Sequence, residues 1–277
     1  MRKEEKVMKS MLEHPILKEM CNIIDNMYRL GWDERNGGNV SYLLKEEEIK
    51  DYVDVNKVIR TYPVNFNAKE LKGYYILMTG TGKYFRNTKA DPETNLGLFR
   101  ISEDGCNAEL LWGYKDGGRS SSETYAHLMC HIERRKVNPN NRVVLHSHPT
   151  STLALTHILP NNDKDFTLAM WRVMTECIVV FPEGISVMPW KLCGTYEIGV
   201  DTSTRMRDHR LVIWGLHGIY GCGDTIDEAF GLVETVEKAA EVYLKYLPFK
   251  EINTITDENL KEVVELFKLN PHEGYLK

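Results

Sequence analysis

The sequence predicts a single mixed α/β domain. Apolar runs typical of strands alternate along the chain with amphipathic segments that favour helices. No internal repeat, low-complexity tract or Pro/Ser-rich linker divides the 277 residues. The composition, 42% hydrophobic and 27% charged, is that of a globular protein, and a chain of this length can bury a large core without disulfides. We expect one domain over residues 1–277, with an N-terminal helical extension over about residues 1–30.

Charge and cysteine content narrow the class of function. Thirty-five basic residues against forty acidic ones give a net charge of −5, so no overall positive field attracts nucleic acid or an anionic membrane. The six cysteines are scattered and form no CxxC pair, which favours reduced thiols. The N-terminal segment lacks the apolar stretch of a signal peptide, and no run of 18 apolar residues occurs. These features favour a cytoplasmic enzyme with a small-molecule substrate.

The first predicted element is a helix over residues 14–30. Pro15 suits a first helical turn, apolar side chains follow at spacings of three and four, and Gly31 is a typical stop. Residues 46–72 mix charge and aromatic side chains without a clean period. That segment predicts a loop with short pieces of regular structure.

Strands follow this loop. Residues 74–79 (YYILMT) form a continuous apolar run that ends in a Gly-rich segment. Residues 98–114 contain an Asp104-Gly105 pair between two apolar runs. An Asp-Gly pair in that setting is a strong hairpin signal, so two further strands are expected.

Helices and one strand are expected in the middle of the chain. Residues 122–137 have a helical pattern, and residues 142–148 (RVVLHSH) read as a strand. Residues 151–159 and 163–174 then predict two more helices. This alternation supports the mixed fold class.

Strands return before the chain ends in helices. Apolar runs flank a Pro-Glu-Gly turn and precede a Gly-rich segment, whereas the last segments open with acidic or capping residues. The predicted strands are 177–181, 185–190 and 210–217, and the predicted helices are 224–246 and 256–269.

Two histidines at the end of a predicted strand carry the sharpest chemical signal. His146 and His148 lie two residues apart, so their side chains project to one face of a sheet. Neutral imidazole is a preferred ligand of Zn²⁺, and a catalytic zinc usually takes three protein ligands. His217, which ends another apolar run before Gly218, is a candidate third ligand. The alternative is that these are polar strand ends with ordinary hydrogen bonds.

A helical set of residues offers a rival metal site. Glu123, His127 and His131 follow each other at intervals of four and form one stripe of the predicted helix. The glutamate that completes an HExxH motif is missing, so packing on an amphipathic face is the stronger interpretation of the two histidines. Glu123 lies in the first helical turn, where a carboxylate can also act only as a cap.

Two Gly-rich segments could bind phosphate. Residues 36–39 (NGGN) follow the first helix, and residues 79–83 (TGTGK) follow a strand. Their glycines allow turns that direct N–H groups at an anion, although each could equally be a plain tight turn. Neither has the spacing of a Walker A motif, and GTG is too short for a dinucleotide fingerprint. ATP and NAD are therefore excluded as expected ligands.

Taken together, these segments resemble the class II aldolase/adducin family, in the family's order and over nearly the whole chain. The segments that carry the resemblance are GWDERNGGNVS (31–41), TGTGKYFRN (79–87), SSETYAH (121–127), VVLHSHPT (143–150), TECIVVFPEG (175–184) and HGIYGCG (217–223). The first and fifth of them favour the members that act on L-rhamnulose 1-phosphate over the fuculose and ribulose relatives.

The resemblance implies a role for eleven residues. Its zinc ligands correspond to His146, His148 and His217, its catalytic carboxylate to Glu123, and a second acidic residue that reaches a neighbouring subunit's site to Glu176. Its substrate phosphate-binding residues correspond to Asn36, Asn39, Thr81, Gly82, Ser121 and Ser122.

The resemblance also implies a fold and an activity. The fold is a mostly antiparallel central sheet between helical layers, assembled as a homotetramer. The activity is zinc-dependent, reversible retro-aldol cleavage of a sugar phosphate to dihydroxyacetone phosphate and an aldehyde. A sugar-phosphate 4-epimerase of the family is one alternative, but such relatives tend to carry Asp in place of Glu123. A non-catalytic, adducin-like interaction module is another, but it would be expected to have lost the histidines.

Overall fold

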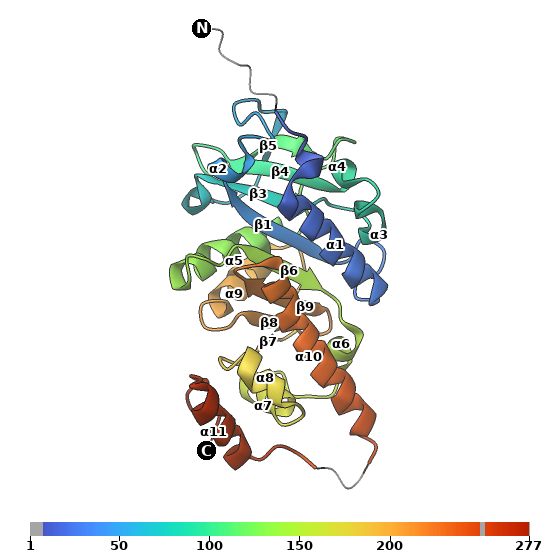
Figure 1. The fold of residues 1–277 in the computed structure, drawn as a ribbon, viewed down its shortest axis with the longest axis vertical. Coiled ribbons are helices and arrows are strands. Elements are labelled where there is room, and N and C mark those ends of the chain that lie inside the picture. Colours follow the sequence, from blue (N-terminus) through green and yellow to red (C-terminus); the bar gives the residue numbers. More distant parts are fainter. Residues whose placement is uncertain (1–7, 250–252, 277) are drawn as a thin grey trace.

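The computed structural model describes residues 8–249 and 253–276, and within them nine strands form one sheet (Figure 1). The strand order is β2-β5-β4-β3-β1-β6-β9-β8-β7, and every neighbouring pair is antiparallel except β7 and β8. The prediction of a mostly antiparallel sheet is therefore confirmed. The strands are β1 (Asn39–Lys45), β2 (Arg60–Pro63), β3 (Tyr74–Thr79), β4 (Leu96–Ile101), β5 (Asn107–Gly113), β6 (Val143–Ser147), β7 (Ser186–Met188), β8 (Leu211–Trp214) and β9 (Gly218–Gly223).

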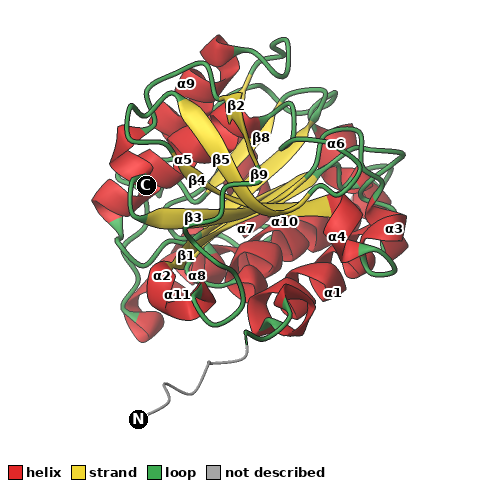
Figure 2. Ribbon diagram, turned by 90° about the horizontal axis from the view of Figure 1, so that it is seen from above, coloured by secondary structure: helices red, strands yellow, loops and turns green. Residues whose placement is uncertain are grey.

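Helices cover both faces of the sheet (Figure 2). The long helices α1 and α10, with α7, α8 and α11, pack on one face, whereas α5 and α9 pack on the other. The helices are α1 (Pro15–Arg29), α2 (Glu46–Ile49), α3 (Phe85–Thr88), α4 (Pro92–Asn95), α5 (Thr124–Val137), α6 (Thr150–Leu155), α7 (Asp163–Trp171), α8 (Thr175–Val180), α9 (Tyr196–Arg205), α10 (Ile226–Tyr246) and α11 (Asp257–Phe267). Two 3-10 turns, η1 (Met11–Glu13) and η2 (Lys69–Leu71), complete the described elements.

Successive side chains of β1 point alternately to the two faces of the sheet. Val40, Tyr42 and Leu44 are buried in the core shared with α1 and α10. Leu43 points to the opposite core, beneath α5, and Ser41 lies on the same face as Leu43. The strand therefore sends apolar side chains to both helical layers. On the side of α5 its polar Ser41 lies toward the end where the partner strand β6 carries His146.

Most predicted elements are present. The helix expected over residues 14–30 is α1, whose first turn holds Pro15 and is capped by the His14 side chain. The predicted N-terminal extension is described from residue 8 onward as η1 and α1, and its first seven residues lie outside the described part. The Asp104-Gly105 hairpin joins β4 to β5 as expected.

One predicted strand is wrong. The apolar run over residues 177–181 forms most of α8 and not a strand. A short apolar run does not distinguish a buried strand from a buried helical turn by its period alone. Here Cys177, Ile178 and Phe181 are fully buried at a helical spacing, in the core cluster that also contains α10.

Several elements were not predicted from the sequence: β1, β9, α9 and the short helices α3 and α4. β1 is buried on both faces, so it lacks the alternation of polar and apolar side chains that marks a surface strand. α9 begins after Thr195, whose side chain caps it, and its pattern of small and polar residues gives a weak helical signal. α9 packs closely on α5 and thereby supports the helix that begins at Glu123.

No helix in residues 8–249 or 253–276 is long and apolar enough to cross a membrane. All six cysteines carry free thiols, as the scattered spacing predicts.

Candidate active site

Three histidines from two neighbouring strand ends meet at one point. His146 lies in β6, His148 follows directly after it, and His217 lies in the tight turn between β8 and β9. One ring nitrogen of each lies within 4.8 Å of the others. The two β6 histidines project together as their spacing predicts, and the antiparallel pairing of β6 with β9 brings in the third.

Hydrogen bonds from the Nδ1 atoms orient the imidazoles of His146 and His148 so that their Nε2 atoms point toward each other. His146 Nδ1 donates to the carbonyl of Ile219 at 3.0 Å, and His148 Nδ1 donates to the carboxylate of Glu34 at 3.0 Å. In a neutral imidazole the other nitrogen, Nε2, then carries a lone pair. The two Nε2 atoms face each other 3.2 Å apart.

That donor set fits a divalent metal. Two lone pairs so close repel each other unless a metal ion or a proton lies between them. Two nitrogens bound to one tetrahedral zinc at its usual bond length lie about 3.3 Å apart, close to the separation of His146 and His148. The three residues can therefore hold a metal ion of the zinc type, with a position left for a substrate.

Burial favours the neutral forms of His146 and His217. Burial lowers the pKa of His146 well below its usual range, and the neighbouring His148 and His217 lower it further. Burial also lowers the pKa of His217, against the opposing effect of Glu123. Neutral imidazole is the form that binds a metal.

Glu123 lies beside the histidines at the N-terminal end of α5. Its Oε2 accepts hydrogen bonds from the Asn39 side-chain amide at 2.9 Å and from the Tyr220 hydroxyl at 2.7 Å. Oε2 is 3.6 Å from His146 Nε2, whereas Oε1 is 3.9 Å from His217 Nε2. The carboxylate is therefore held from one side and borders the candidate metal position on the other.

The sheet register explains this arrangement. His146 pairs with Asn39 of β1 on one side and with Tyr220 of β9 on the other. Paired residues of antiparallel strands project to the same face, so all three side chains point toward α5. Three neighbouring strands thus supply one polar row beneath the helix that starts at Glu123.

The rival helical set is not assembled as a metal site. Both His127 and His131 are buried, and each has a ring nitrogen 2.7 Å from the Ser41 hydroxyl. The other ring nitrogen of His127, Nε2, bonds to the side-chain oxygen of Asn39. Burial lowers the pKa of His127 to about 3 and that of His131 well below its usual range. Both rings are therefore neutral members of a buried hydrogen-bond network.

Two of the predicted phosphate-binding segments lie side by side. A bridge pairs Gly80 with Ser120, and the Ser121 N–H donates to the Thr79 carbonyl at 3.1 Å. This antiparallel pairing places Thr81 opposite Arg119, with its N–H donating to the Arg119 carbonyl at 2.9 Å, and joins the Gly-rich loop to the segment that leads into α5. The N–H groups of a helix start favour an anion. Lys83, from the same loop, pairs with Asp116 and is not among the residues that gather at the histidines.

The loop over residues 36–38 packs against the candidate metal site. A Cβ on Gly37 would come within 2.9 Å of His148 Cε1, and one on Gly218 within 2.7 Å of His148 Cδ2. Both positions need glycine because any side chain would displace the imidazole. Asn36 is exposed at the rim of this loop, whereas Asn39 is buried with both ends of its amide already bonded to protein groups. A phosphate contact for Asn39 stays a prediction.

Glu176 is separate from the other predicted residues. It lies exposed in the first turn of α8 and is not in the histidine group found in the described part of the chain. The single chain therefore gives it no partner at the site, which leaves the predicted contact with a neighbouring subunit open.

Three residues at the site were missed by sequence reasoning. Glu34 holds His148, Tyr220 holds Glu123, and the exposed Cys193 lies with Glu123 and His217 within 4.8 Å. Tyr220 could have been found only from the strand register. The proximity of Cys193 depends on the loop before α9 and left no signal in the sequence.

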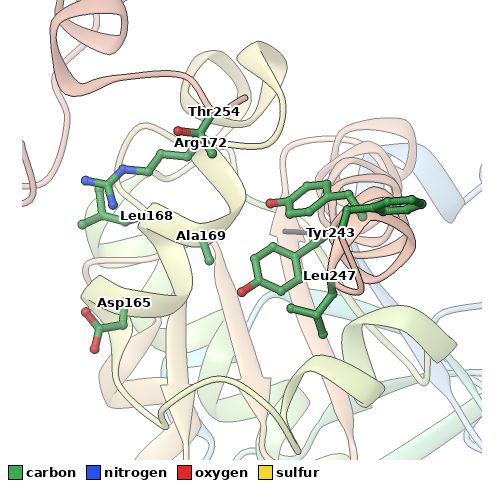
Figure 3. A pocket seen from close by; sticks show the side chains of 9 residues that line it. Asp165, Leu168, Ala169, Arg172, Tyr243, Leu247 and Thr254 are labelled. Carbon is green, nitrogen blue, oxygen red and sulfur yellow. The ribbon is translucent and has the colours of Figure 1, made fainter. Parts of the chain in front are cut away.

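A cavity elsewhere in the molecule contains none of the predicted residues. It lies between α7 and the end of α10 and has a volume of about 290 Å³ (Figure 3). Apolar side chains such as Leu168 and Leu247 line it together with Tyr243 and Arg172. The chemistry-bearing residues instead gather at the carboxyl end of β6.

Comparison with known proteins places this geometry among aldolases. The family described as the class II aldolase and adducin N-terminal domain matches residues 18–244. Rhamnulose-1-phosphate aldolase of Listeria monocytogenes serotype 4b (strain CLIP80459) is 50% identical over 269 residues, 97% of this chain and 98% of the relative. The enzyme of that name from Enterococcus faecalis is 47% identical, covering 97% and 96%, and that from Yersinia pseudotuberculosis is 40% identical, covering 95% and 97%.

Solved structures share the fold. A sugar-phosphate aldolase from Thermotoga maritima aligns with a TM-score of 0.73 at 28% identity, over 86% of this chain and 97% of that one. An L-fuculose 1-phosphate aldolase aligns with a TM-score of 0.61 at 20% identity, over 95% and 99%. The second likeness concerns the fold alone.

The buried histidines predict a loss of stability in acid. The unfolded chain protonates His127 near its ordinary pKa of 6.5, whereas the folded chain does so only at about 3. The unfolded state therefore binds more protons between these values, and stability falls as the pH falls, by up to about 1.4 kcal/mol per pH unit for one such group. In His127→Gln, the free energy of unfolding in urea should fall less steeply between pH 6.5 and 4.5. His157 is exposed and provides the control, because His157→Gln should keep the wild-type slope. An unchanged slope in His127→Gln would contradict the interpretation of His127 as a buried, neutral imidazole.

Proposed function

The chain belongs to the class II aldolase and adducin family, and on that premise we propose that it is an aldolase that cleaves L-rhamnulose 1-phosphate reversibly to dihydroxyacetone phosphate and L-lactaldehyde. The observation that carries the proposal is the full-length identity of up to 50% with rhamnulose-1-phosphate aldolases, joined to a donor set that suits a metal. The enzyme is a carbon–carbon lyase of a metal-dependent class.

We propose zinc as the metal, held by His146, His148 and His217. When bound, the ion would stabilise the negative charge that develops on the dihydroxyacetone phosphate half as the C3–C4 bond breaks. Three imidazole ligands suit a catalytic zinc with an open site. The contacts of Ile219 and Glu34 with the outer ring nitrogens would keep two ligands oriented.

Glu123 would be the proton-transfer residue. In the synthetic direction it removes a proton from C3 of dihydroxyacetone phosphate, and in cleavage it returns that proton. Its place beside His146 and His217 supports this role, because the reacting carbon must lie next to the ion that those ligands hold. Lys83 needs no Schiff-base role in this chemistry, in line with its ion pair to Asp116.

The substrate phosphate would bind where the loops meet the start of α5. Thr81, Ser121 and Ser122 would supply hydroxyl donors, Gly82 and Ser122 would supply N–H donors, and Asn36 and Asn39 complete the proposed set. The pairing of Gly80 with Ser120, which joins the two segments, supports this proposal. Binding of this non-reacting group would fix the position of the carbons that react.

We further propose a homotetramer in which Glu176 reaches the site of a neighbouring subunit. Its exposure on α8 leaves it accessible to another copy of the chain. Large apolar side chains near the site also support a covered face: Trp190 is 62% exposed, Leu192 63%, Tyr196 50% and Leu216 47%. A run of exposed apolar side chains beside a site is typical of an interface. The free thiols fit a cytoplasmic location.

Metal removal tests the function and the ligands together. Purified enzyme should convert L-rhamnulose 1-phosphate to dihydroxyacetone phosphate and lactaldehyde, lose that activity in a chelator and regain it with Zn²⁺. His148→Ala should lose bound zinc and nearly all cleavage, because one of three ligands is removed. His131→Ala is the matched histidine control and should keep one zinc per subunit by elemental analysis. Formation of an epimeric sugar phosphate instead of two fragments would favour the 4-epimerase alternative.

Substitution of Glu123 tests the proton transfer. Glu123→Gln should still bind zinc and dihydroxyacetone phosphate but fail to exchange the C3 proton with solvent deuterium, since an amide has the shape of the carboxyl without its basicity. NMR of the ligand in D₂O measures the exchange. Exchange at the wild-type rate would remove Glu123 from the mechanism, and loss of the folded state would favour a capping role.

Mixed oligomers test the shared site. Glu123→Gln and Glu176→Ala enzymes should each be nearly inactive alone. If one site takes Glu123 from one subunit and Glu176 from the next, random co-assembly in equal amounts should restore about a quarter of the sites. Co-expression with two different tags, followed by a cleavage assay of the doubly purified oligomers, measures this. Activity no higher than that of the separate variants, despite proven mixing, would place both residues in one subunit's site or Glu176 outside catalysis.

A further inference from the structure

A buried chain of hydrogen bonds leads from Glu123 into the interior beneath α5. Its first link is the bond from the Asn39 amide to Glu123 Oε2 at 2.9 Å. A carboxylate can only accept, so the Asn39 amide must turn its NH₂ end to Glu123 and its oxygen away. The orientation of Asn39 therefore decides whether it attracts or repels the carboxylate.

The contacts behind Asn39 allow only one direction of donation. Asn39 Oδ1 contacts His127 Nε2, which must therefore carry the hydrogen. His127 Nδ1 then accepts from the Ser41 hydroxyl at 2.7 Å. The oxygen of Ser41 in turn accepts from His131 Nε2 at 2.7 Å. Each link follows from the one before it, starting from the negative charge.

Burial makes this order costly to change. His127 and Ser41 are fully buried, His131 is 1% exposed and Asn39 5%. A buried polar group without a partner is destabilising, so a reversed amide or the other imidazole tautomer would leave two like groups facing each other. Burial also holds the pKa of His127 near 3, and only the neutral ring can both donate and accept.

We propose that His127 is a positioning residue for Glu123, acting through the Asn39 amide. This inference rests on the proposed function, in which Glu123 transfers a proton. The His127 N–H fixes the oxygen end of Asn39, and Ser41 and His131 hold the ring in the tautomer that this needs. His127 and His131 of α5 thus support the carboxylate of Glu123 and do not form a second metal site.

The support also distinguishes the two oxygens of Glu123. Both oxygens border the histidines, Oε2 at 3.6 Å from His146 and Oε1 at 3.9 Å from His217. Oε2 is occupied by hydrogen bonds from Asn39 and Tyr220, whereas Oε1 accepts none from the described residues. The structure thereby assigns the proton transfer to Oε1: as the C3–H bond breaks, an Oε1–H bond forms and the electron pair stays on the carbon half. Return of the proton reverses these changes.

Two isosteric amides at position 127 test the proposal. Gln places its side-chain nitrogen about where Nε2 of histidine lies, within reach of Asn39, whereas Asn reaches only the Nδ1 position beside Ser41. His127→Gln should keep most of the C3 proton exchange of dihydroxyacetone phosphate. His127→Asn should lower the exchange rate by about 10- to 100-fold, the range typical of groups that orient a metal-site residue. Zinc content and the dissociation constant of dihydroxyacetone phosphate should stay unchanged in both.

Ser41→Ala extends the test with a smaller change that removes a single hydroxyl. It should lower exchange less than His127→Asn does, with zinc content retained, because it releases the ring without removing its donor. Equal loss in the Asn and Gln variants, loss in proportion to the fall in melting temperature, or loss of zinc would overturn the positioning role. A wild-type enzyme that shows no exchange at all would instead overturn the proposed function on which this inference rests.

Discussion

The close approach of two imidazole lone pairs is the constraint on which the rest of the site depends. The Nε2 atoms of His146 and His148 lie 3.2 Å apart, a separation that a metal ion bound by both nitrogens, or a proton between them, would stabilise. The Ile219 carbonyl and the Glu34 carboxylate hold the outer nitrogens, and two glycines leave room for the His148 ring. The surroundings of β6 therefore hold both imidazoles in an orientation that suits a shared metal ion.

The same constraint accounts for the polar interior beneath α5. Packing hydrocarbon against this face of the sheet would stabilise the fold more simply. Instead, three polar side chains of β1, β6 and β9 project toward α5: Asn39, His146 and Tyr220. Glu123 and His127, at the start of α5, lie against them. Glu123 accepts from Asn39 and Tyr220, Asn39 bonds to His127, and His146 donates to the Ile219 carbonyl. The network therefore remains compatible with a folded core while it fixes the carboxylate.

The parts of this arrangement differ in how far the sequence reveals them. A spacing of two along a strand determines that His146 and His148 share a face, so their convergence is predictable. The roles of Tyr220 and Ser41 depend on strand register, which pairs residues more than 70 positions apart and leaves no local signal. The strand predicted over residues 177–181 is wrong for a related reason, because tertiary packing decided between helix and strand for a short apolar run.

The acidic side chains beside His146, His148 and His217 do not account for both proton transfers of the proposed reaction. Among the described residues, the carboxylates that contact these histidines are Glu34 and Glu123. Glu34 is hydrogen-bonded to His148. Burial raises the pKa of Glu34, but its hydrogen bonds outweigh burial and lower the pKa below its usual value. Glu34 is therefore a poor proton donor. Glu123 serves the C3 proton in our proposal. Cleavage also takes a proton from the sugar hydroxyl on the aldehyde half, and a separate group must handle it. An acid from a neighbouring copy is the economical source, which is the position that we propose for Glu176.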